Sequence, residues 1–407
     1  MTCNCVIMNF EVMIMIYRDR YIAPVRDFYD SDLIKIITGI RRCGKSVILD
    51  EIMSEIQEKT DNIIDLDFED ASVLMELPDA ISLIKYVDEH RNPGKCYVFL
   101  DEVQRVKDWA VACRTIRLHD CSVFISGSNS KLLSKEFTKE LSGRYVSFRV
   151  RPFVYKELCE YAEELGKELS ITDYLVWGGF PKRLEFNGTD AQKVYLNDLN
   201  ETIIINDIIN RYGIRKTDLF RRIANYVLIS NARVFSARSV HDYLGSNGFP
   251  CSVGTVTKYL GYLEEAFAIE SVKLYSGKAK RELCYYQKIY DEDVSLNSIR
   301  CATGRYDLSH NLENIVYNEL LYMGYSLQVY YDGKEEIDFV AIKDNKQYFI
   351  QVAYSVAEEK AYNREFKAFK NIDNSCQKIL ISNDELDYST STVRHIKLAD
   401  FLRMGSL

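Results

Sequence analysis

The sequence contains few of the residues that build long linkers, metal sites and membrane spans. Only six of its 407 residues are proline, so we expect the connections between elements to be short. The five histidines are scattered, and none of the eleven cysteines forms a CxxC pair, which argues against a structural metal site. No apolar run reaches the length of a membrane span. Free thiols in this number favour a reducing cytoplasm, and we expect no membrane partner.

An excess of positive charge is also absent. The formal net charge is −8 and the isoelectric point is about 5.4, so the molecule as a whole is not a general nucleic-acid binder. The length predicts two or three domains. Residues 1–14 are apolar but have neither the basic region nor the cleavage site of a signal peptide. We therefore expect the natural start at Met13 or Met15, and the first domain to begin at residue 15.

The most informative stretch is DLIKIITGIRRCGKS, residues 32–46. An apolar strand-like run leads into the pattern GxxxxGK[ST], and a helix-forming segment follows. In this setting the backbone N–H groups of the loop and the first turn of the helix bind nucleotide phosphates. Lys45 can reach the β- and γ-phosphates, and the Ser46 hydroxyl can bind Mg²⁺. The loop residues expected to contact the nucleotide are Gly39, Ile40, Arg41, Arg42, Cys43, Gly44, Lys45, Ser46 and Val47.

Strand-like and helical runs alternate over residues 15–150. The strand-like runs cover 33–38, 62–68, 96–101 and 122–127, and helical runs cover 44–60, 77–90 and 106–118. Such alternation predicts an α/β fold, in which a parallel sheet is covered by helices on both faces. Ligands of such sheets bind at the carboxyl ends of the strands, where the glycine-rich loop and the acidic motif below both fall.

Two acidic residues follow the third predicted strand, 55 residues after Ser46. Asp101 and Glu102 form a Walker B pattern, in which the aspartate binds Mg²⁺ and the glutamate acts as general base toward water. Ser128 or Asn129, after the next strand, either belongs to a plain turn or contacts the γ-phosphate. Arg144 is either a surface arginine or an arginine finger for a neighbouring subunit, which would require a homo-oligomer.

The sequence pattern of residues 151–281, the middle of the chain, predicts a helical lid followed by a winged-helix-like unit. Within it, residues 215–281 follow the winged-helix order of short helices and then strands. This unit holds eleven lysines and arginines against five acids, a surplus of six positive charges that makes DNA a candidate partner. The candidate recognition helix, 252–266, has only one lysine, Lys258. A module used only for packing is therefore the alternative.

Five motifs together resemble a family of prokaryotic AAA+-like ATPases: TGIRRCGKS, NIIDLDFED, VFLDEVQRVKDW, GSNSKLL…LSGRY and WGGFP. The resemblance spans residues 17–380. It implies a P-loop NTPase fold, ATP and Mg²⁺ as ligands, and a C-terminal domain of undefined role. The preference for ATP over GTP rests on this resemblance, and the sequence contains no guanine-selective NKxD motif.

The last part of the chain, residues 282–407, returns to a mixed α/β pattern that resembles a PD-(D/E)XK nuclease core. The resemblance puts Glu313 on a helix, Asp338 at a strand and Gln351 on the next strand. In that family two acids and a lysine assemble a metal site for phosphodiester hydrolysis. Here Gln351 stands where the second acid would be, and Ala353 where the lysine would be. We therefore expect a degenerate nuclease-like domain without nuclease activity.

These observations leave three functions open. The sequence favours Mg²⁺-dependent ATP hydrolysis coupled to DNA or a protein partner, with Lys45, Glu102, Asn129 and Arg144 as the catalytic set. One alternative is an ATP-switched DNA-binding module with little turnover. The other is an ATP-gated, metal-dependent nuclease that uses the remnants Glu313, Asp338 and Gln351.

Overall fold

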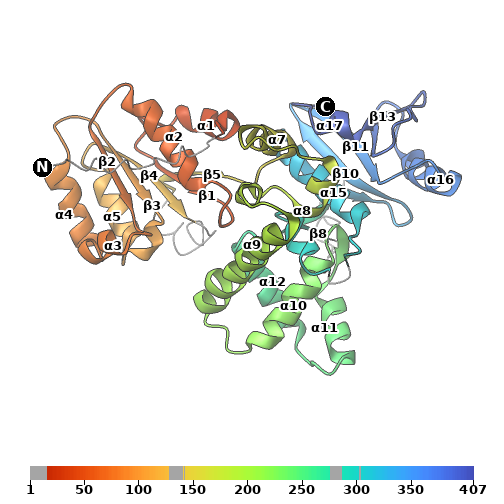
Figure 1. Cartoon of the computed structure of the whole chain (residues 1–407), viewed down its shortest axis with the longest axis horizontal. Coiled ribbons are helices and arrows are strands. Elements are labelled where there is room, and N and C mark those ends of the chain that lie inside the picture. The colour runs from red at the N-terminus through yellow and green to blue at the C-terminus, as the bar shows by residue number, and fades with distance from the viewer. Residues whose placement is uncertain (1–15, 128–140, 142, 276–286, 302–303) are drawn as a thin grey trace, which may run out of the picture.

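The computed structural model of the chain describes residues 16–127, 141, 143–275, 287–301 and 304–407. The described strands form two sheets, one in the first part of the chain and one that runs from the middle part into the last (Figure 1). A helical region, which includes α9, α10, α11 and α12, lies below and between them in the view of Figure 1.

The first sheet has five strands in the order β2-β3-β4-β1-β5, and every neighbouring pair is parallel. The strands are β1 (Ile34–Thr38), β2 (Ile63–Asp67), β3 (Cys96–Asp101), β4 (Cys121–Gly127) and β5 (Tyr145–Arg149). The four strands predicted from the alternating pattern are confirmed to within one residue at each end. The sequence runs did not single out β5 as a fifth strand.

Helices cover both faces of this sheet, as the pattern predicted. They are α1 (Asp19–Arg26), α2 (Lys45–Gln57), α3 (Ala71–Glu76), α4 (Ala80–His90) and α5 (Trp109–Ile116). Because strand side chains alternate, Ile37 of β1 packs with residues of α1 and α2, whereas Ile34 and Ile36 pack with residues of α4 and α5. The loop between β1 and α2 is thereby fixed at the carboxyl edge of the sheet.

The middle part is mostly helical. Its elements are α7 (Tyr155–Glu164), α8 (Ile171–Trp177), a 3₁₀ turn (Pro181–Glu185), α9 (Thr189–Thr202), a π-helical segment (Ile203–Asn210), α10 (Thr217–Ile229), β6 (Arg233–Phe235), α11 (Ala237–Ser246), α12 (Val253–Glu265) and β7 (Ile269–Tyr275). The helices are interrupted at the WGGFP motif, since α8 ends at Trp177 and Gly178 has a φ of 65°. A side chain at Gly178 would overlap Asp293.

The last part contains α14 (Ser295–Ser298), α15 (Leu308–Tyr322), α16 (Glu359–Ala368), α17 (Leu398–Phe401) and six strands. The strands are β8 (Gln287–Asp291), β9 (Ser326–Tyr331), β10 (Glu336–Lys343), β11 (Lys346–Ala353), β12 (Gln377–Ser382) and β13 (Val393–Lys397). They join the middle strands in one eight-stranded sheet of order β13-β12-β11-β10-β9-β7-β8-β6. The sheet is continuous across the predicted boundary at residues 281/282, because β7 pairs with both β8 and β9.

Candidate nucleotide-binding site

The loop between β1 and α2 has the backbone conformation that its glycines predict. Gly39, Arg42 and Gly44 have φ angles of 153°, 65° and 98°, and Gly44 precedes the first residue of α2. A Cβ atom on Gly39 would lie 2.1 Å from the Val150 carbonyl oxygen, so no larger residue fits there without moving β5. The loop is thus a tight, left-handed turn at the start of a helix.

Lys45 and Ser46 open α2 and face different surroundings. Lys45 is 6% exposed, and its Nζ donates a hydrogen bond to the Ile40 carbonyl oxygen of the same loop at 3.2 Å. Its ammonium therefore lies inside the curl of the loop. Ser46 is exposed, and its hydroxyl forms a side-chain hydrogen bond with Asp101. The strand β3 thus presents its last residue to the first turn of α2.

Asp101 and Glu102 lie at the carboxyl end of β3, as predicted. The Asp101 carboxylate accepts hydrogen bonds from the Ser126 hydroxyl and from the Glu102 backbone N–H, the latter at 3.0 Å. Burial raises the pKa of both carboxyl groups, and the Lys45 ammonium opposes this in each case. Glu102 has a φ of 48°, which turns the chain sharply just after the strand, and its side chain accepts a hydrogen bond from Gln104.

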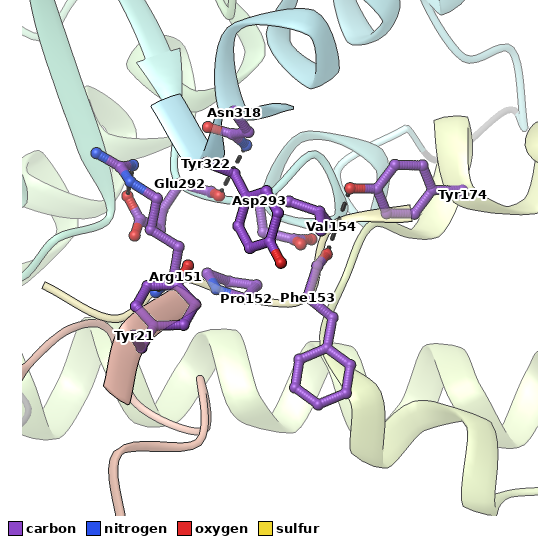
Figure 2. A pocket seen from close by; sticks show the side chains of 10 residues that line it. All are labelled: Tyr21, Arg151, Pro152, Phe153, Val154, Tyr174, Glu292, Asp293, Asn318 and Tyr322. Carbon is purple, nitrogen blue, oxygen red and sulfur yellow. Dashed lines mark hydrogen bonds and ion pairs between the residues drawn. The ribbon is translucent and has the colours of Figure 1, made fainter. Parts of the chain in front are cut away.

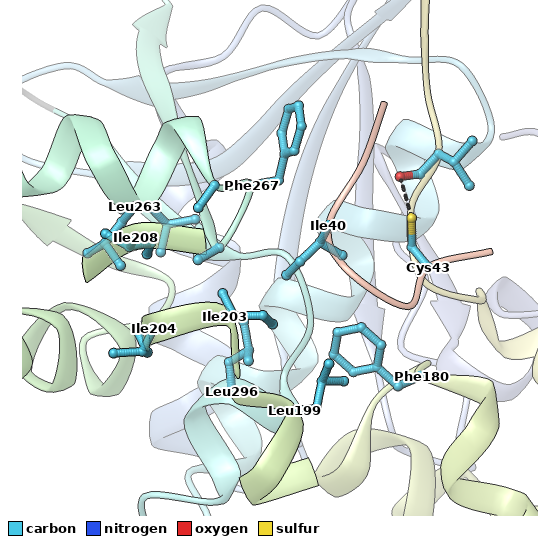
Figure 3. Close-up of a cluster of buried hydrophobic side chains, with 14 of the residues drawn as sticks. Ile40, Cys43, Phe180, Leu199, Ile203, Ile204, Ile208, Leu263, Phe267 and Leu296 are labelled. Atoms are coloured by element: carbon cyan, nitrogen blue, oxygen red, sulfur yellow. Dashed lines mark hydrogen bonds between the residues drawn. The ribbon is translucent and has the colours of Figure 1, made fainter. Parts of the chain in front are cut away.

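The side chains of Ile40 and Cys43 point into the protein rather than toward solvent (Figure 3). Ile40 is fully buried in a cluster with Leu199 and Ile203 of the helical middle part. The Cys43 thiol donates to the Val150 carbonyl oxygen at 3.4 Å. These two residues can therefore meet a nucleotide only through their backbone groups. Among the remaining loop residues, Arg42 is exposed and Val47 is half-buried.

Three residues near the loop were not foreseen from the sequence as members of the site. Asp207, in the π-helical segment, accepts two hydrogen bonds from Arg41, from Nε at 3.1 Å and from Nη2 at 3.0 Å. Glu69 lies 3.5 Å from the same guanidinium. Arg211, one turn beyond Asp207, is close enough to Glu102 and Asp207 to interact with both, while burial lowers its pKa. The only sequence signal was polar residues inside the apolar run IIINDIINR.

Arg18 holds the glycine-rich loop through a buried hydrogen bond to its backbone. This residue is 2% exposed, and its Nη1 donates to the Cys43 carbonyl oxygen at 3.0 Å. Its Nε and Nη2 donate to the two carboxylate oxygens of Glu157 at 2.9 and 2.8 Å. Glu157 lies on α7, so this ion pair connects the loop with the first helix of the middle part.

The three parts of the chain meet around a small pocket beside Arg18 (Figure 2). Arg151 donates to Glu292 at 2.8 Å across it, and Asn318 donates to the Glu292 carbonyl oxygen at 3.1 Å. The lining residues are Tyr21, Arg151, Pro152, Phe153, Val154, Tyr174, Glu292, Asp293, Asn318 and Tyr322. The pocket is a junction between parts that are far apart in the sequence.

The other predicted catalytic residues lie apart from the loop or outside the described residues. Arg144 is exposed and immediately precedes β5, at the amino edge of the sheet and opposite to the glycine-rich loop. Such a position excludes contact with the nucleotide site of its own chain, so Arg144 is either a surface arginine or a contact to a neighbouring copy. Ser128 and Asn129 lie outside the described residues.

The residues that resemble a nuclease core do come together. Glu313 of α15 and Asp338 of β10 both bind the ammonium group of Lys288 on β8. Gln351 of β11 accepts a hydrogen bond from the Asp338 backbone N–H at 3.4 Å and donates to Glu365 of α16 at 2.8 Å. Lys288 and Glu365 were not predicted, because neither lies within the motif of the family.

Comparisons with known proteins support the P-loop fold of the first domain. An AAA domain model matches residues 31–159, and a domain of unknown function (DUF8612) matches residues 168–304. The solved structure of the Walker-type ATPase Paby2304 of Pyrococcus abyssi superposes with a TM-score of 0.50 at 16% identity, over 70% of this chain and 96% of that chain. At that identity the likeness shows the fold alone. No helix in the described part of the chain is long and apolar enough to cross a membrane.

Two relatives match almost end to end. An uncharacterized protein of Methanocaldococcus jannaschii is 29% identical over 377 residues, covering 86% of this chain and 82% of that protein. An uncharacterized protein of Haemophilus influenzae is 30% identical over 379 residues, covering 90% of this chain and 93% of that protein. The chain therefore belongs to the same family as the Haemophilus influenzae protein, and it carries an AAA-type P-loop domain in front of an α/β domain.

Proposed function

We propose that this protein binds ATP with Mg²⁺ and hydrolyses it. The observation that carries the proposal is the convergence of Lys45, Ser46, Asp101 and Glu102 at the carboxyl ends of β1 and β3. A buried ammonium, a hydroxyl and two carboxylates at a helix start form the set that phosphoryl transfer to water requires. The AAA domain match and the fold of a Walker-type ATPase support the same reaction.

Each residue of the site has a proposed role that follows from its side chain. The loop N–H groups and the Lys45 ammonium would bind the β- and γ-phosphates, for which Lys45 must leave the Ile40 carbonyl. The oxygens of Ser46 and Asp101 already hydrogen-bond with each other, and they are the ligand type that Mg²⁺ prefers, so they fit one shared cation. When bound, Mg²⁺ would neutralise charge on the phosphate oxygens.

Glu102 is the proposed general base. Its carboxyl group lies beside Lys45 and Asp101, and burial raises its pKa, which strengthens it as a proton acceptor once ionised. Ser128 or Asn129 is the proposed contact to the γ-phosphate. We propose for Arg144 a role in a neighbouring copy of the chain, because its position opposite the loop rules out one in its own site.

Two variants test the reaction. Glu102→Gln should retain ATP binding and slow hydrolysis about 100-fold or more, because it removes the base but keeps the shape. Lys45→Ala should weaken ATP binding, since it removes the buried ammonium. Steady-state phosphate release and nucleotide titration measure the two effects. Glu58→Gln and Lys59→Ala, at exposed positions after α2, are the matched controls and should behave as the unmodified protein. Unchanged hydrolysis in both site variants would refute the proposal.

DNA is the proposed partner of the middle part, which we assign to the winged-helix class. The described elements α10, β6, α11, α12, β7 and β8 follow one another in that order, and β8 pairs with both β6 and β7. Exposed basic residues on this unit are Arg215, Lys216, Arg238, Lys258 and Lys273. Three further arginines pair with acids, which reduces the free charge.

A filter-binding titration tests this partner. DNA affinity should fall steeply as salt increases, and the double change Arg215→Ser with Lys216→Ser should weaken binding at every salt concentration. The ATPase rate should respond to DNA in the unmodified protein. Salt-independent binding, or a rate indifferent to DNA, would point to a protein partner instead.

A further inference from the structure

A buried charged centre in the last part of the chain has no place in ATP hydrolysis. The Nζ atom of Lys288 lies 2.8 Å from Glu313 Oε1, 2.5 Å from Glu336 Oε1 and 2.9 Å from Asp338 Oδ1. The lysine comes from β8, Glu313 from α15 and the other two acids from β10. Three carboxylates from two elements thus converge on one ammonium group from a third.

Three of the four residues of this centre are buried, and the Glu336 side chain is 28% exposed. Lys288, Glu313 and Asp338 are 4%, 8% and 5% exposed. The Tyr290 hydroxyl donates to Glu313 Oε1 at 2.7 Å, and Asp338 Oδ2 accepts the Val352 backbone N–H at 3.0 Å. Burial by itself would lower the pKa of Lys288, but Asp338 and Glu313 more than offset it, so the pKa lies above its usual value and the amine stays charged.

The Lys288 ammonium group occupies the position that a bound metal cation would take. Carboxylate oxygens from neighbouring elements are the ligands by which Mg²⁺ and Mn²⁺ are bound in proteins. Within the described residues, however, no group of three or more histidine, cysteine, aspartate or glutamate side chains is arranged to hold a metal ion. At this centre the Lys288 ammonium group lies between the three carboxylates.

We propose that the Lys288 ammonium replaces a divalent cation in this centre and fixes β8 to α15 and β10. The strand that carries Lys288 pairs with β6 and β7 of the middle part, whereas the carboxylates belong to the α15 and β10 side. Removing Lys288 would leave the buried Glu313 and Asp338 carboxylates without their cation, which is costly. The centre is therefore a permanent, structural cluster of ion pairs.

The neighbouring residues fit the same role. Gln351, at the position of the expected second acid, uses its amide to hold Glu365 of α16 at 2.8 Å. Glu365 is itself buried. The residues that resemble a nuclease core thus connect β8, α15, β10, β11 and α16 with one another. The centre holds no open cation position for phosphodiester hydrolysis, which speaks against the nuclease alternative.

Mn²⁺ binding by the full chain without nucleotide tests this proposal. Mn²⁺ should not change the thermal unfolding midpoint of the unmodified protein, because the ammonium excludes the ion. It should not change the midpoint of Asp338→Asn either. Lys288→Met should gain an Mn²⁺-dependent rise of the midpoint and bind Mn²⁺ about tenfold more tightly, or better, since the repelling charge is gone. Lys288→Met combined with Asp338→Asn should lose this gain while the P-loop remains intact.

Several outcomes would overturn the proposal. One is Mn²⁺ binding by the unmodified protein, seen as loss of the free-ion electron paramagnetic resonance signal, that disappears in Asp338→Asn. Another is Mn²⁺-dependent DNA cleavage that Asp338→Asn abolishes. A third is a folded Lys288→Met variant that binds no more Mn²⁺ than the unmodified protein. If Lys288→Met does not fold, the first two measurements still decide.

Discussion

Lys35 is a charged residue inside the first sheet, in the strand that leads to the nucleotide loop. It is fully buried, and its Nζ donates to the Ser122 hydroxyl at 2.6 Å and to the Ser31 carbonyl oxygen at 3.3 Å. Burial lowers its pKa to about 7. The folded state therefore binds fewer protons than the unfolded state between about pH 7 and the ordinary lysine pKa of 10.5, so this residue makes stability rise with pH in that window.

Lys35→Met should remove this pH dependence. The variant should gain stability relative to the unmodified protein near neutral pH, because no amine has to be deprotonated or desolvated. The advantage should shrink by about 2 kcal/mol between about pH 7 and about pH 9. Urea unfolding of both proteins at the two pH values measures it. An equal difference at both values would show that Lys35 is not responsible.

At the scale of elements, the nucleotide loop is bound to the π-helical segment by charge and by apolar packing. The Arg41–Asp207 pair is bidentate, and Ile40 beside it lies in the helical core. π-Helical turns often occur where a side chain must be presented at a functional site. In the proposed ATP site, Asp207 would compete with phosphate oxygens for the Arg41 guanidinium.

Asp207→Asn should release Arg41 toward the nucleotide. If the proposed ATP site is correct, ATP should bind several-fold more tightly, while the protein should lose about 2 kcal/mol of stability because a largely buried partner is removed. Titration with a fluorescent ATP analogue and urea unfolding measure the two effects. Asp198→Asn, exposed on α9, is the control and should change neither. Weaker binding by Asp207→Asn would show that the pair preorganises the loop instead.

At the scale of the whole molecule, the loop, the middle part and the last part are tied together through buried charges. Arg18 connects Cys43 with Glu157, and Tyr155, two residues before Glu157, donates its backbone N–H to Glu319 of α15 at 2.8 Å. The guanidinium also lies 4.3 Å from the Tyr21 ring and 4.6 Å from the Phe153 ring. The loop is thereby connected through buried contacts to α15 of the last part.

Arg18→Met should destabilise the protein by about 3–5 kcal/mol, because the Glu157 carboxylate would stay buried without its cation. The double variant Arg18→Met with Glu157→Gln should lose less than the sum of the two single changes. Chemical unfolding of the four proteins gives the coupling energy. Additive losses would mean that the two side chains act independently.

The local signals of the sequence predicted the candidate site well. The first four strands of the sheet, the glycine-rich loop and the Asp101–Glu102 pair all lie where the alternating pattern and the motifs put them, whereas β5 was not among the strand-like runs. Each of these features depends on residues that are close in the chain, such as a glycine that must adopt positive φ or a strand that ends in acids. Sequence reasoning is strongest for such features.

The sequence by itself determined the P-loop domain, its ligand-binding edge and the resemblance of Glu313 and Asp338 to a nuclease core. The tertiary structure decided which charges meet: Arg41 with Asp207, Arg18 with Glu157, and Lys288 with three carboxylates. These partners are between 25 and 166 residues apart. The physical reason is that a buried charge needs an opposite charge in space, and packing of distant elements alone determines which one is there.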